Sequence, residues 1–258
     1  MDLFGFYRIL SYGWGGYDGY YSGTASRMNG GYTLLLIAAL AIMLLGIFAQ
    51  ARVQKVFNQY SQIPSSGGRT AAQVANDLLR SNGSAVSVQQ IQGALTDNYN
   101  PKAGAVSLSQ TVYGSSSIAA IAVAAHECGH VMQYESGYGL IKLRNAILPV
   151  ANIGARFSYL IVIIGLLMGA MGHTVCMIGV ALFGFALAFQ LLTLPVELDA
   201  SNRALNMLTA GGYITGNAEE NAARKVLRAA AFTYLVAVLS SAISFLRLLM
   251  IANSNRRR

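Results

Sequence analysis

Four long apolar stretches constrain the fold of this chain more than any other feature. They cover residues of about 32–51, 149–172, 175–194 and 229–251. A helix that crosses the hydrocarbon core of a bilayer needs about 20 predominantly apolar residues, and each stretch reaches that length. In lipid, every backbone polar group must find its partner inside the segment, which a helix achieves. The sequence therefore predicts a mostly α, integral membrane protein with four transmembrane helices.

The composition excludes two other classes of protein. Of the 258 residues, 54% are hydrophobic and only 11% are charged, whereas ordinary globular domains carry about 25% charged residues. A soluble globular enzyme and a disordered chain are both excluded by these values. The net charge of +8 does not indicate nucleic-acid binding, because the Lys and Arg residues flank the apolar stretches, as interfacial anchors do.

The remaining chain divides into an arm and two polar segments. Residues 1–31 are rich in Gly and Tyr, and we expect a flexible or interfacial N-terminal arm whose aromatic rings lie at the level of the lipid headgroups. The polar segments are residues 52–146 and 195–228. We expect them to form, together with the four membrane helices, one domain over residues 32–258.

Capping residues predict the helices of the polar segments. Thr70 can cap a helix over 71–80, and three serines precede a longer helix over 118–134. Pro195 is expected to begin another helix, which Gly211 and Gly212 end.

Two β-prone runs complete this region. They are residues 85–91 and 105–108, with a turn over 98–104 between them. After Gly211 and Gly212, Asn217 and Glu220 have the spacing of an N-cap pair for a helix that continues into the fourth span. The prediction is a small α+β region carried by the membrane helices.

The helix over 118–134 contains the motif His-Glu-Cys-Gly-His, with His126 and His130 four residues apart. At this spacing both imidazoles lie on one helix face and can bind one Zn²⁺. Glu127 is offset by one residue, where a carboxylate can accept a proton from an activated water and return it to the leaving amine. The chain has three histidines, and two of them form this motif in a helical context, which favours a zinc site over coincidence.

A catalytic zinc site needs a third protein ligand. His173 lies between the second and third spans, on the opposite membrane face from His130, and is interpreted as a solvated loop residue. After the second and third spans, the chain is again on the membrane face that carries the motif, and Glu197 is the first acidic residue there. Glu197 is therefore the preferred ligand. Ser201 shares its helix face and is interpreted as a residue that orients a ligand.

Other polar residues near Glu197 have simpler interpretations. Asp199 and Arg203 have the i,i+4 spacing of a structural ion pair, and Glu219 and Glu220 are interpreted as cap residues. The developing oxyanion needs a donor, for which Arg203, Tyr213 and Tyr234 remain open.

Three motifs resemble one bacterial family. They are Ala-Ala-Ile-Ala-Val-Ala-Ala-His-Glu-Cys-Gly-His at 119–130, Leu-Pro-Val-Glu-Leu-Asp-Ala-Ser-Asn-Arg-Ala at 194–204, and the stretch 222–234. They resemble the YugP-type membrane zinc metallopeptidases, whose layout is similar to that of the HtpX and CAAX prenyl protease group. The resemblance implies His126, His130 and Glu197 as ligands of one Zn²⁺, Glu127 as catalytic base, and a zincin-like α+β region at the membrane interface.

The chain departs from this pattern at one position, since the related group has Asp where Ser201 stands. Cys128 fills a variable position of the motif and is expected to point away from the ligand face. An extended polypeptide substrate commonly pairs with a strand edge beside the zinc helix, and residues 105–108 are the predicted edge.

The predicted function is a zinc endopeptidase that hydrolyses membrane-proximal or unfolded proteins. The alternative is a catalytically silent zinc-binding scaffold or chaperone-like partner in the membrane. We expect a multi-pass protein of the plasma membrane whose partners are the lipid bilayer and a polypeptide, with no nucleic acid and an open oligomeric state. A small excess of Lys and Arg near the membrane ends of 52–146 and 195–228 favours a cytoplasmic site.

Overall fold

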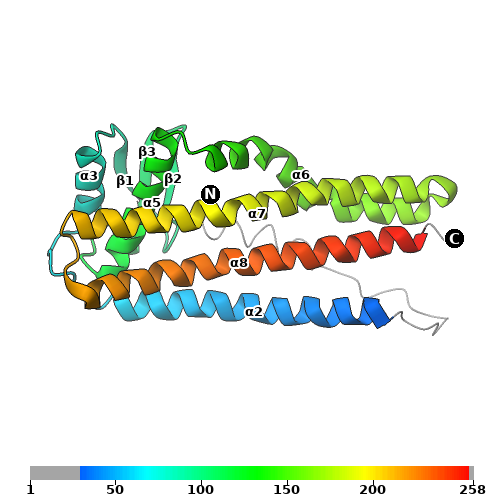
Figure 1. The fold of residues 1–258 in the computed structure, drawn as a ribbon, viewed down its shortest axis with the longest axis horizontal. Helices are drawn as coiled ribbons and strands as arrows, with labels where there is room; N and C mark the ends of the chain where they lie inside the picture. Colours follow the sequence, from blue (N-terminus) through cyan, green and yellow to red (C-terminus); the bar gives the residue numbers. More distant parts are fainter. Residues whose placement is uncertain (1–29, 256–258) are drawn as a thin grey trace. The chain divides into compact units, whose positions relative to one another are not determined.

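The computed structural model describes residues 30–255, so the predicted arm lies almost entirely outside the described residues (Figure 1). The elements in chain order are α2 (Gly30–Tyr60), α3 (Ala71–Ser81), β1 (Ser87–Ile91), β2 (Asn98–Asn100), β3 (Ala105–Ser109), α4 (Gln110–Tyr113), α5 (Ile118–Glu135), α6 (Gly139–Leu167), the 3₁₀ turn η1 (Gly169–Met171), α7 (Gly172–Ala210) and α8 (Gly216–Asn255).

Four helices are long and apolar enough to cross a membrane. The segments that qualify within the described residues are Thr33–Tyr60, Gly139–Leu167, Gly169–Ala210 and Gly216–Ser254. With one small three-stranded sheet beside them, they confirm the predicted fold class, a mostly α membrane protein with a small α+β region. The prediction of a single domain over residues 32–258 stays a prediction.

The membrane helices are longer than the apolar stretches, and two predicted starts were wrong. Helix α6 begins at Gly139 and contains Pro149. Helix α7 continues through Pro195, which was expected to begin a separate helix. A proline inside a helix removes one backbone hydrogen bond, but membrane helices tolerate this where neighbouring groups satisfy the freed carbonyl.

Helix α8 begins at Gly216 and continues without a break into the fourth span. The cap predicted for its start was wrong. Instead of Asn217 with Glu220, the Glu219 carboxylate accepts hydrogen bonds from the backbone N–H groups of Thr215 and Ser66, both at 2.8 Å. Glu220 pairs with Arg224 one turn further along the helix.

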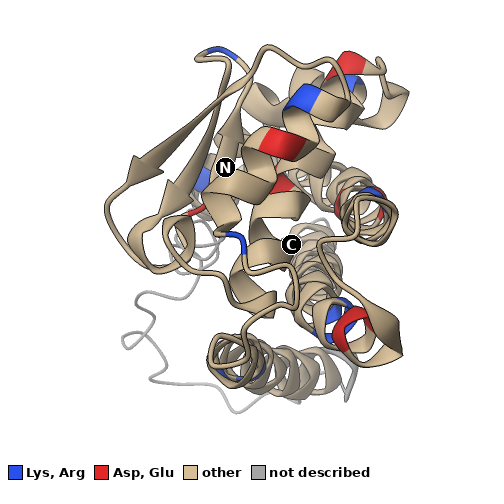
Figure 2. Cartoon of the chain, turned by 90° about the vertical axis from the view of Figure 1, so that its left-hand side faces the viewer, with Lys and Arg blue, Asp and Glu red and all other residues tan. Residues whose placement is uncertain are grey.

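The chain folds into two compact units, and each long helix contributes residues to both. One unit comprises Phe48–Lys142 and Thr193–Tyr234 in its described part, and we call it the site unit. It holds every described Asp and Glu residue, and Figure 2 colours these residues red. The second, the apolar unit, carries only the three arginines Arg144, Arg156 and Arg247 as charged side chains within its described residues.

The core of the site unit joins α3, α5 and the sheet. Thr70 and Gln73 form a reciprocal capping box at the start of α3, and the Ser117 side chain accepts from the backbone of Ala120 at the start of α5. Both predicted caps are confirmed. Strand β3 packs against this core with every residue buried.

The strand order is β1-β3-β2, with β1 parallel and β2 antiparallel to β3. Val106 pairs with Val88 on one side and with Tyr99 on the other. The residues 105–108 are therefore in the central strand, and the prediction that they form a free edge was wrong. Part of the predicted turn over 98–104 is the short edge strand β2.

In the apolar unit, small residues let α6 and α7 approach closely. A Cβ on Gly179 would lie 2.8 Å from the carbonyl oxygen of Ser158, and one on Gly165 would lie 2.6 Å from the Sγ atom of Cys176. Small residues at helix interfaces are typical of membrane helices, since close backbone approach increases van der Waals contact. Cys176 is fully buried in this packing.

Candidate metal centre

Helix α5 carries the first two candidate ligands. Its N-terminal half is built from small and apolar residues that are buried in the core of the site unit. This burial fixes the orientation of the helix, and the four-residue spacing places His126 and His130 on one face. Their rings lie edge to face, with centroids 4.8 Å apart.

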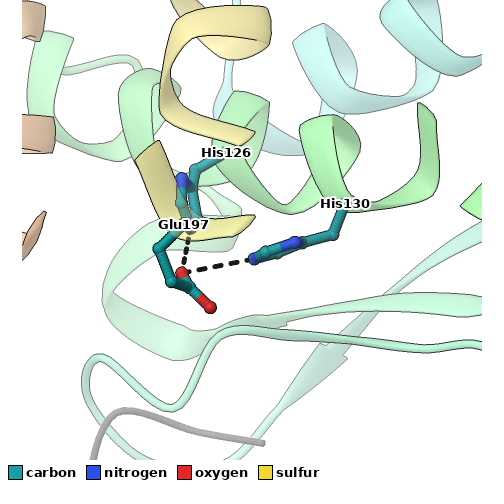
Figure 3. A group of neighbouring side chains, drawn as sticks. All are labelled: His126, His130 and Glu197. Carbon is teal, nitrogen blue, oxygen red and sulfur yellow. Dashed lines mark hydrogen bonds and ion pairs between the residues drawn. The ribbon is translucent and has the colours of Figure 1, made fainter. Parts of the chain in front are cut away.

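Glu197 on α7 completes the group. Its Oε2 atom lies 3.2 Å from Nε2 of His126 and 3.5 Å from Nε2 of His130 (Figure 3). Among the described residues these three side chains form the group of His, Cys, Asp and Glu that can hold one metal ion, with ligand atoms all within 4.8 Å. The structure thus brings together the three residues that the sequence singled out.

The arrangement fits zinc. In a tetrahedral site with bonds of about 2.0–2.1 Å, neighbouring ligand atoms are about 3.3 Å apart. The two separations from Glu197 Oε2 agree with this value. Two imidazoles and one carboxylate form a known catalytic ligand set for zinc, which leaves a further coordination position open.

A glycine inside the motif lets α7 reach the histidines. A Cβ on Gly129 would lie 2.5 Å from the carbonyl oxygen of Ala200 and 3.3 Å from its Cα atom. Because both are backbone atoms of α7, no side-chain movement can relieve that contact. The close approach of the two backbones carries Glu197 and Ser201, which flank Ala200 on α7, to the histidines.

Hydrogen bonds surround the histidines on the side opposite Glu197. The Nδ1 atom of His126 shares a hydrogen bond of 3.2 Å with the Ser201 hydroxyl, at the position interpreted as orienting a ligand. His130 Nδ1 lies 2.9 Å from Oε1 of Gln133.

The contact of Gln133 with His130 was not predicted from the sequence. The position of Gln133 three residues after His130 on α5 places it on the same helix face, which is the signal that could have identified it. Its amide also donates to Val196 and to Asp199 on α7.

Glu127 lies next to the ligands and is 8% exposed. Its carboxylate forms no hydrogen bond within the part of the chain that the structure describes. A buried carboxylate without a fixed partner remains able to accept a proton, as a general base requires.

A second buried carboxyl, Asp97, lies close enough to Glu127 to be affected by its charge. Burial raises the pKa of Asp97 from 3.8 to about 6; hydrogen bonds from Ser109 oppose this rise, and the negative charge of Glu127 adds to it. Asp97 accepts from the backbone N–H of Ser109 at 2.8 Å. No role was predicted for Asp97, since nothing in its neighbourhood along the chain predicts burial.

Two further pKa values reflect the surroundings of α5. Burial lowers the pKa of His130, but the adjacent Glu197 carboxylate outweighs this effect and raises it. Burial raises the pKa of the Cys128 thiol. Its Sγ atom points to the carbonyl oxygen of Ala75 on α3, so Cys128 faces away from the ligands, as expected.

Two other candidate residues lie outside the group. His173 is in the first turn of α7 within the apolar unit, where Nδ1 lies 3.0 Å from the carbonyl oxygen of Ala252. It is not a ligand, but it is half-buried and helical rather than a solvated loop residue. Arg203 donates through Nε to Asp199 at 2.7 Å, which confirms the expected i,i+4 pair.

Comparison with known proteins identifies the family. The family described as "Putative neutral zinc metallopeptidase" matches residues 34–253. The "Putative membrane protease YugP" of Bacillus subtilis (strain 168) is 42% identical over 226 residues, which are 87% of this chain and 98% of that protein. The chain belongs to this zinc metallopeptidase family. No solved structure matches it.

Membership confirms the resemblance seen in the motifs at 119–130 and 194–204. It implies zinc as the metal, and the relative's description together with the four apolar helices makes this a membrane protein. Because the match to the family extends over nearly all described residues, it includes both helices that supply the candidate ligands.

Proposed function

We propose that this protein is an integral membrane zinc endopeptidase. The observation that carries the proposal is the convergence of His126, His130 and Glu197 on one point, next to the buried carboxylate of Glu127 on the same helix. A purely structural zinc site has no need of such a base beside it. Membership in a zinc metallopeptidase family supports the proposal.

In this proposal the ligands hold one Zn²⁺, which when bound lowers the pKa of a water molecule and polarises the scissile carbonyl group. Glu127 accepts the proton from the attacking water and then donates it to the nitrogen of the leaving amine.

The substrate is proposed to be an extended polypeptide that adds to the sheet at strand β2. Since β3 is central, the sheet has its two edges at β1 and β2. Strand β2 is the edge beside the zinc helix, because the ring of Tyr99 packs edge to face against Tyr134 on α5, with centroids 5.6 Å apart. Because main-chain hydrogen bonds at such an edge do not depend on the side chains, substrates of many sequences can bind there, as unfolded proteins would.

We further propose that the natural substrates are membrane-proximal and that the site is cytoplasmic. Glu197 is in the helix that also supplies the third candidate span, so a substrate anchored in the same bilayer meets the site at high effective concentration. The basic residues Arg52, Lys55, Lys142 and Arg144 flank the adjoining spans, and basic residues accumulate on the cytoplasmic side.

The test combines metal analysis with a cleavage assay on the purified full-length protein in detergent. The substrate is an unfolded, fluorescently labelled protein. We expect one zinc per chain and cleavage by wild type, and we expect Glu127→Gln to retain zinc but lose cleavage. Glu135→Gln is the matched control on the same helix, since Glu135 bonds to Ser84 instead. A wild type that holds zinc but cleaves nothing would favour the scaffold interpretation.

A further inference from the structure

The Gln133 side chain is fully buried and uses its whole amide group. It is 0% exposed. Its Nε2 atom donates to the carbonyl oxygen of Val196 at 2.7 Å and to Oδ2 of Asp199 at 2.8 Å. Its Oε1 atom faces Nδ1 of His130 at 2.9 Å. One glutamine on α5 thus connects a candidate ligand to two positions on α7.

These contacts determine which way the amide points. Val196 offers a carbonyl oxygen and Asp199 a carboxylate oxygen, and both can only accept hydrogen bonds. A flipped Gln133 would place its own oxygen against both of these acceptors. The two N–H groups must therefore face α7, and Oε1, an acceptor, must face His130.

The amide orientation in turn determines the hydrogen on His130. Because Oε1 of Gln133 can only accept, Nδ1 of His130 must carry the hydrogen and donate it. The other ring nitrogen, Nε2, is then the one that offers a lone pair. It is also the atom that lies 3.5 Å from Oε2 of Glu197, on the side where the candidate ligands converge.

We propose that Gln133 is a positioning residue, which holds His130 as the Nδ1–H tautomer and aims its Nε2 atom at the metal. The proposal rests on the proposed zinc site. An outer hydrogen bond of this kind fixes the ring and raises the basicity of the ligand.

An ion pair holds the far end of the network. Oδ2 of Asp199 accepts from Nε of Arg203 at 2.7 Å as well as from Gln133, and the Arg203 guanidinium lies over the ring of Tyr138, 5.8 Å from its centroid. The charge-assisted hydrogen bond from Arg203 fixes the position of the oxygen that accepts from Gln133. The ion pair of Asp199 with Arg203 thus also helps to hold Gln133 in place.

The experiment measures zinc affinity by competition with a chelator, on the purified full-length protein in detergent. Gln133→Met keeps the volume of the side chain but removes both the acceptor and the donors. We expect zinc to bind about 10–100-fold more weakly, the usual effect of losing an outer-shell partner. The visible spectrum of the Co²⁺-loaded protein should change as well, since the ligand geometry is altered.

The matched control is Gln190→Met, which removes another buried glutamine amide of the chain, outside the residues that contact the ligands. We expect zinc affinity and the Co²⁺ spectrum to stay as in wild type. If wild type binds zinc and Gln133→Met binds it equally well, the role of Gln133 is refuted while the zinc site stands. If wild type itself binds no zinc, the proposed function fails too.

A reversal of the contact between Gln133 and Asp199 gives a second test, which also applies if Gln133→Met does not fold. Gln133→Glu places a carboxylate against Asp199, and zinc affinity should fall. Adding Asp199→Asn supplies a donor to the new carboxylate, so the double variant should recover part of that affinity. A double variant no better than Gln133→Glu alone would overturn the proposal.

Discussion

The two histidines of the motif are equivalent in sequence but not in their surroundings. Both are on α5, and both point Nε2 at the same oxygen of Glu197, at 3.2 Å and 3.5 Å. Behind His126 stands the hydroxyl of Ser201, which can donate or accept and so leaves the tautomer undetermined. Behind His130 stands Gln133, whose amide is held from α7 at both N–H groups.

An HExxH motif fixes the spacing of its two histidines, but it does not fix which residues hold each ring in place. The spacing comes from the helix, whereas the support comes from whatever residues pack behind each ring. In this chain a fixed amide, that of Gln133, orients His130, whereas a hydroxyl, that of Ser201, contacts His126. We therefore expect changes behind the two rings to have unequal effects on zinc binding.

The largest effect should come from a change that disturbs both histidines together. In Gly129→Ala the new Cβ meets the backbone of Ala200, so α5 and α7 must separate and Glu197 moves away from both rings. Overpacking of this kind costs about 1–3 kcal/mol, and zinc content measured after purification should fall to background.

Gly139→Ala is the control for this change, because a Cβ there meets no atom within 4 Å. It should leave zinc content and melting temperature as in wild type. Full zinc occupancy in Gly129→Ala would mean that the close contact of the two helices is not needed for the site.

The next largest effect should separate the two histidines. Ser201→Ala removes a single hydroxyl contact of 3.2 Å from His126, while Gln133→Met removes the fixed acceptor of His130. The Ser201 hydroxyl restricts the ring of His126 less than the Gln133 amide restricts that of His130. Chelator competition should therefore show a smaller loss of zinc affinity for Ser201→Ala than for Gln133→Met. An equal or larger loss for Ser201→Ala would show that His130 is not held more firmly than His126.

A smaller effect in the opposite direction is expected for Ser201→Asp. A carboxylate at this position can only accept, so it would fix the Nδ1–H tautomer of His126 as Gln133 fixes that of His130. We expect zinc affinity to increase. Ser201→Asn, which has similar size but no charge, serves as the control and should give a smaller gain. Weaker binding by Ser201→Asp than by wild type would contradict this expectation.

The smallest effect on zinc is expected at Asp97, which contacts neither histidine. Its pKa of about 6 in the folded protein is above its ordinary value of 3.8, so the folded state keeps a proton that the unfolded state releases. The free energy of unfolding should therefore fall as pH rises from about 4 to about 6, by at most about 3 kcal/mol.

Melting curves of wild type and Asp97→Asn across this pH range measure that contribution. We expect the asparagine variant to lose this part of the pH dependence and to keep zinc affinity unchanged. A pH dependence identical in both proteins would show that Asp97 does not carry it.

Local signals accounted for much of the fold and for all three candidate ligands. Thr70 with Gln73 and Ser117 are caps that are recognisable in sequence, because capping depends on neighbouring residues. Glu197 was found by counting membrane crossings, which needs only the lengths of the apolar stretches.

The errors arose where distant contacts override local signals. Pro149 and Pro195 lie inside helices, although locally each is a start signal. Strand β2 has three residues in a turn-rich stretch, and it forms because β3 offers it a partner. Asp97 could not be assigned a role, since its partner Ser109 is 12 residues away in the chain. For Gln133 the sequence offers the short spacing to His130 but not the contact with Val196, which is 63 residues away.

X-ray absorption at the zinc edge of the purified wild-type protein measures the proposed ligand set itself. We expect one zinc with two imidazole nitrogens at about 2.0–2.1 Å and carboxylate or water oxygens at about 2.0–2.2 Å. A zinc–sulfur distance of about 2.3 Å, the value for a cysteine ligand, would contradict it. That result would mean that a cysteine, Cys128 or Cys176, binds the metal, and that His126, His130 and Glu197 are not its full set of protein ligands.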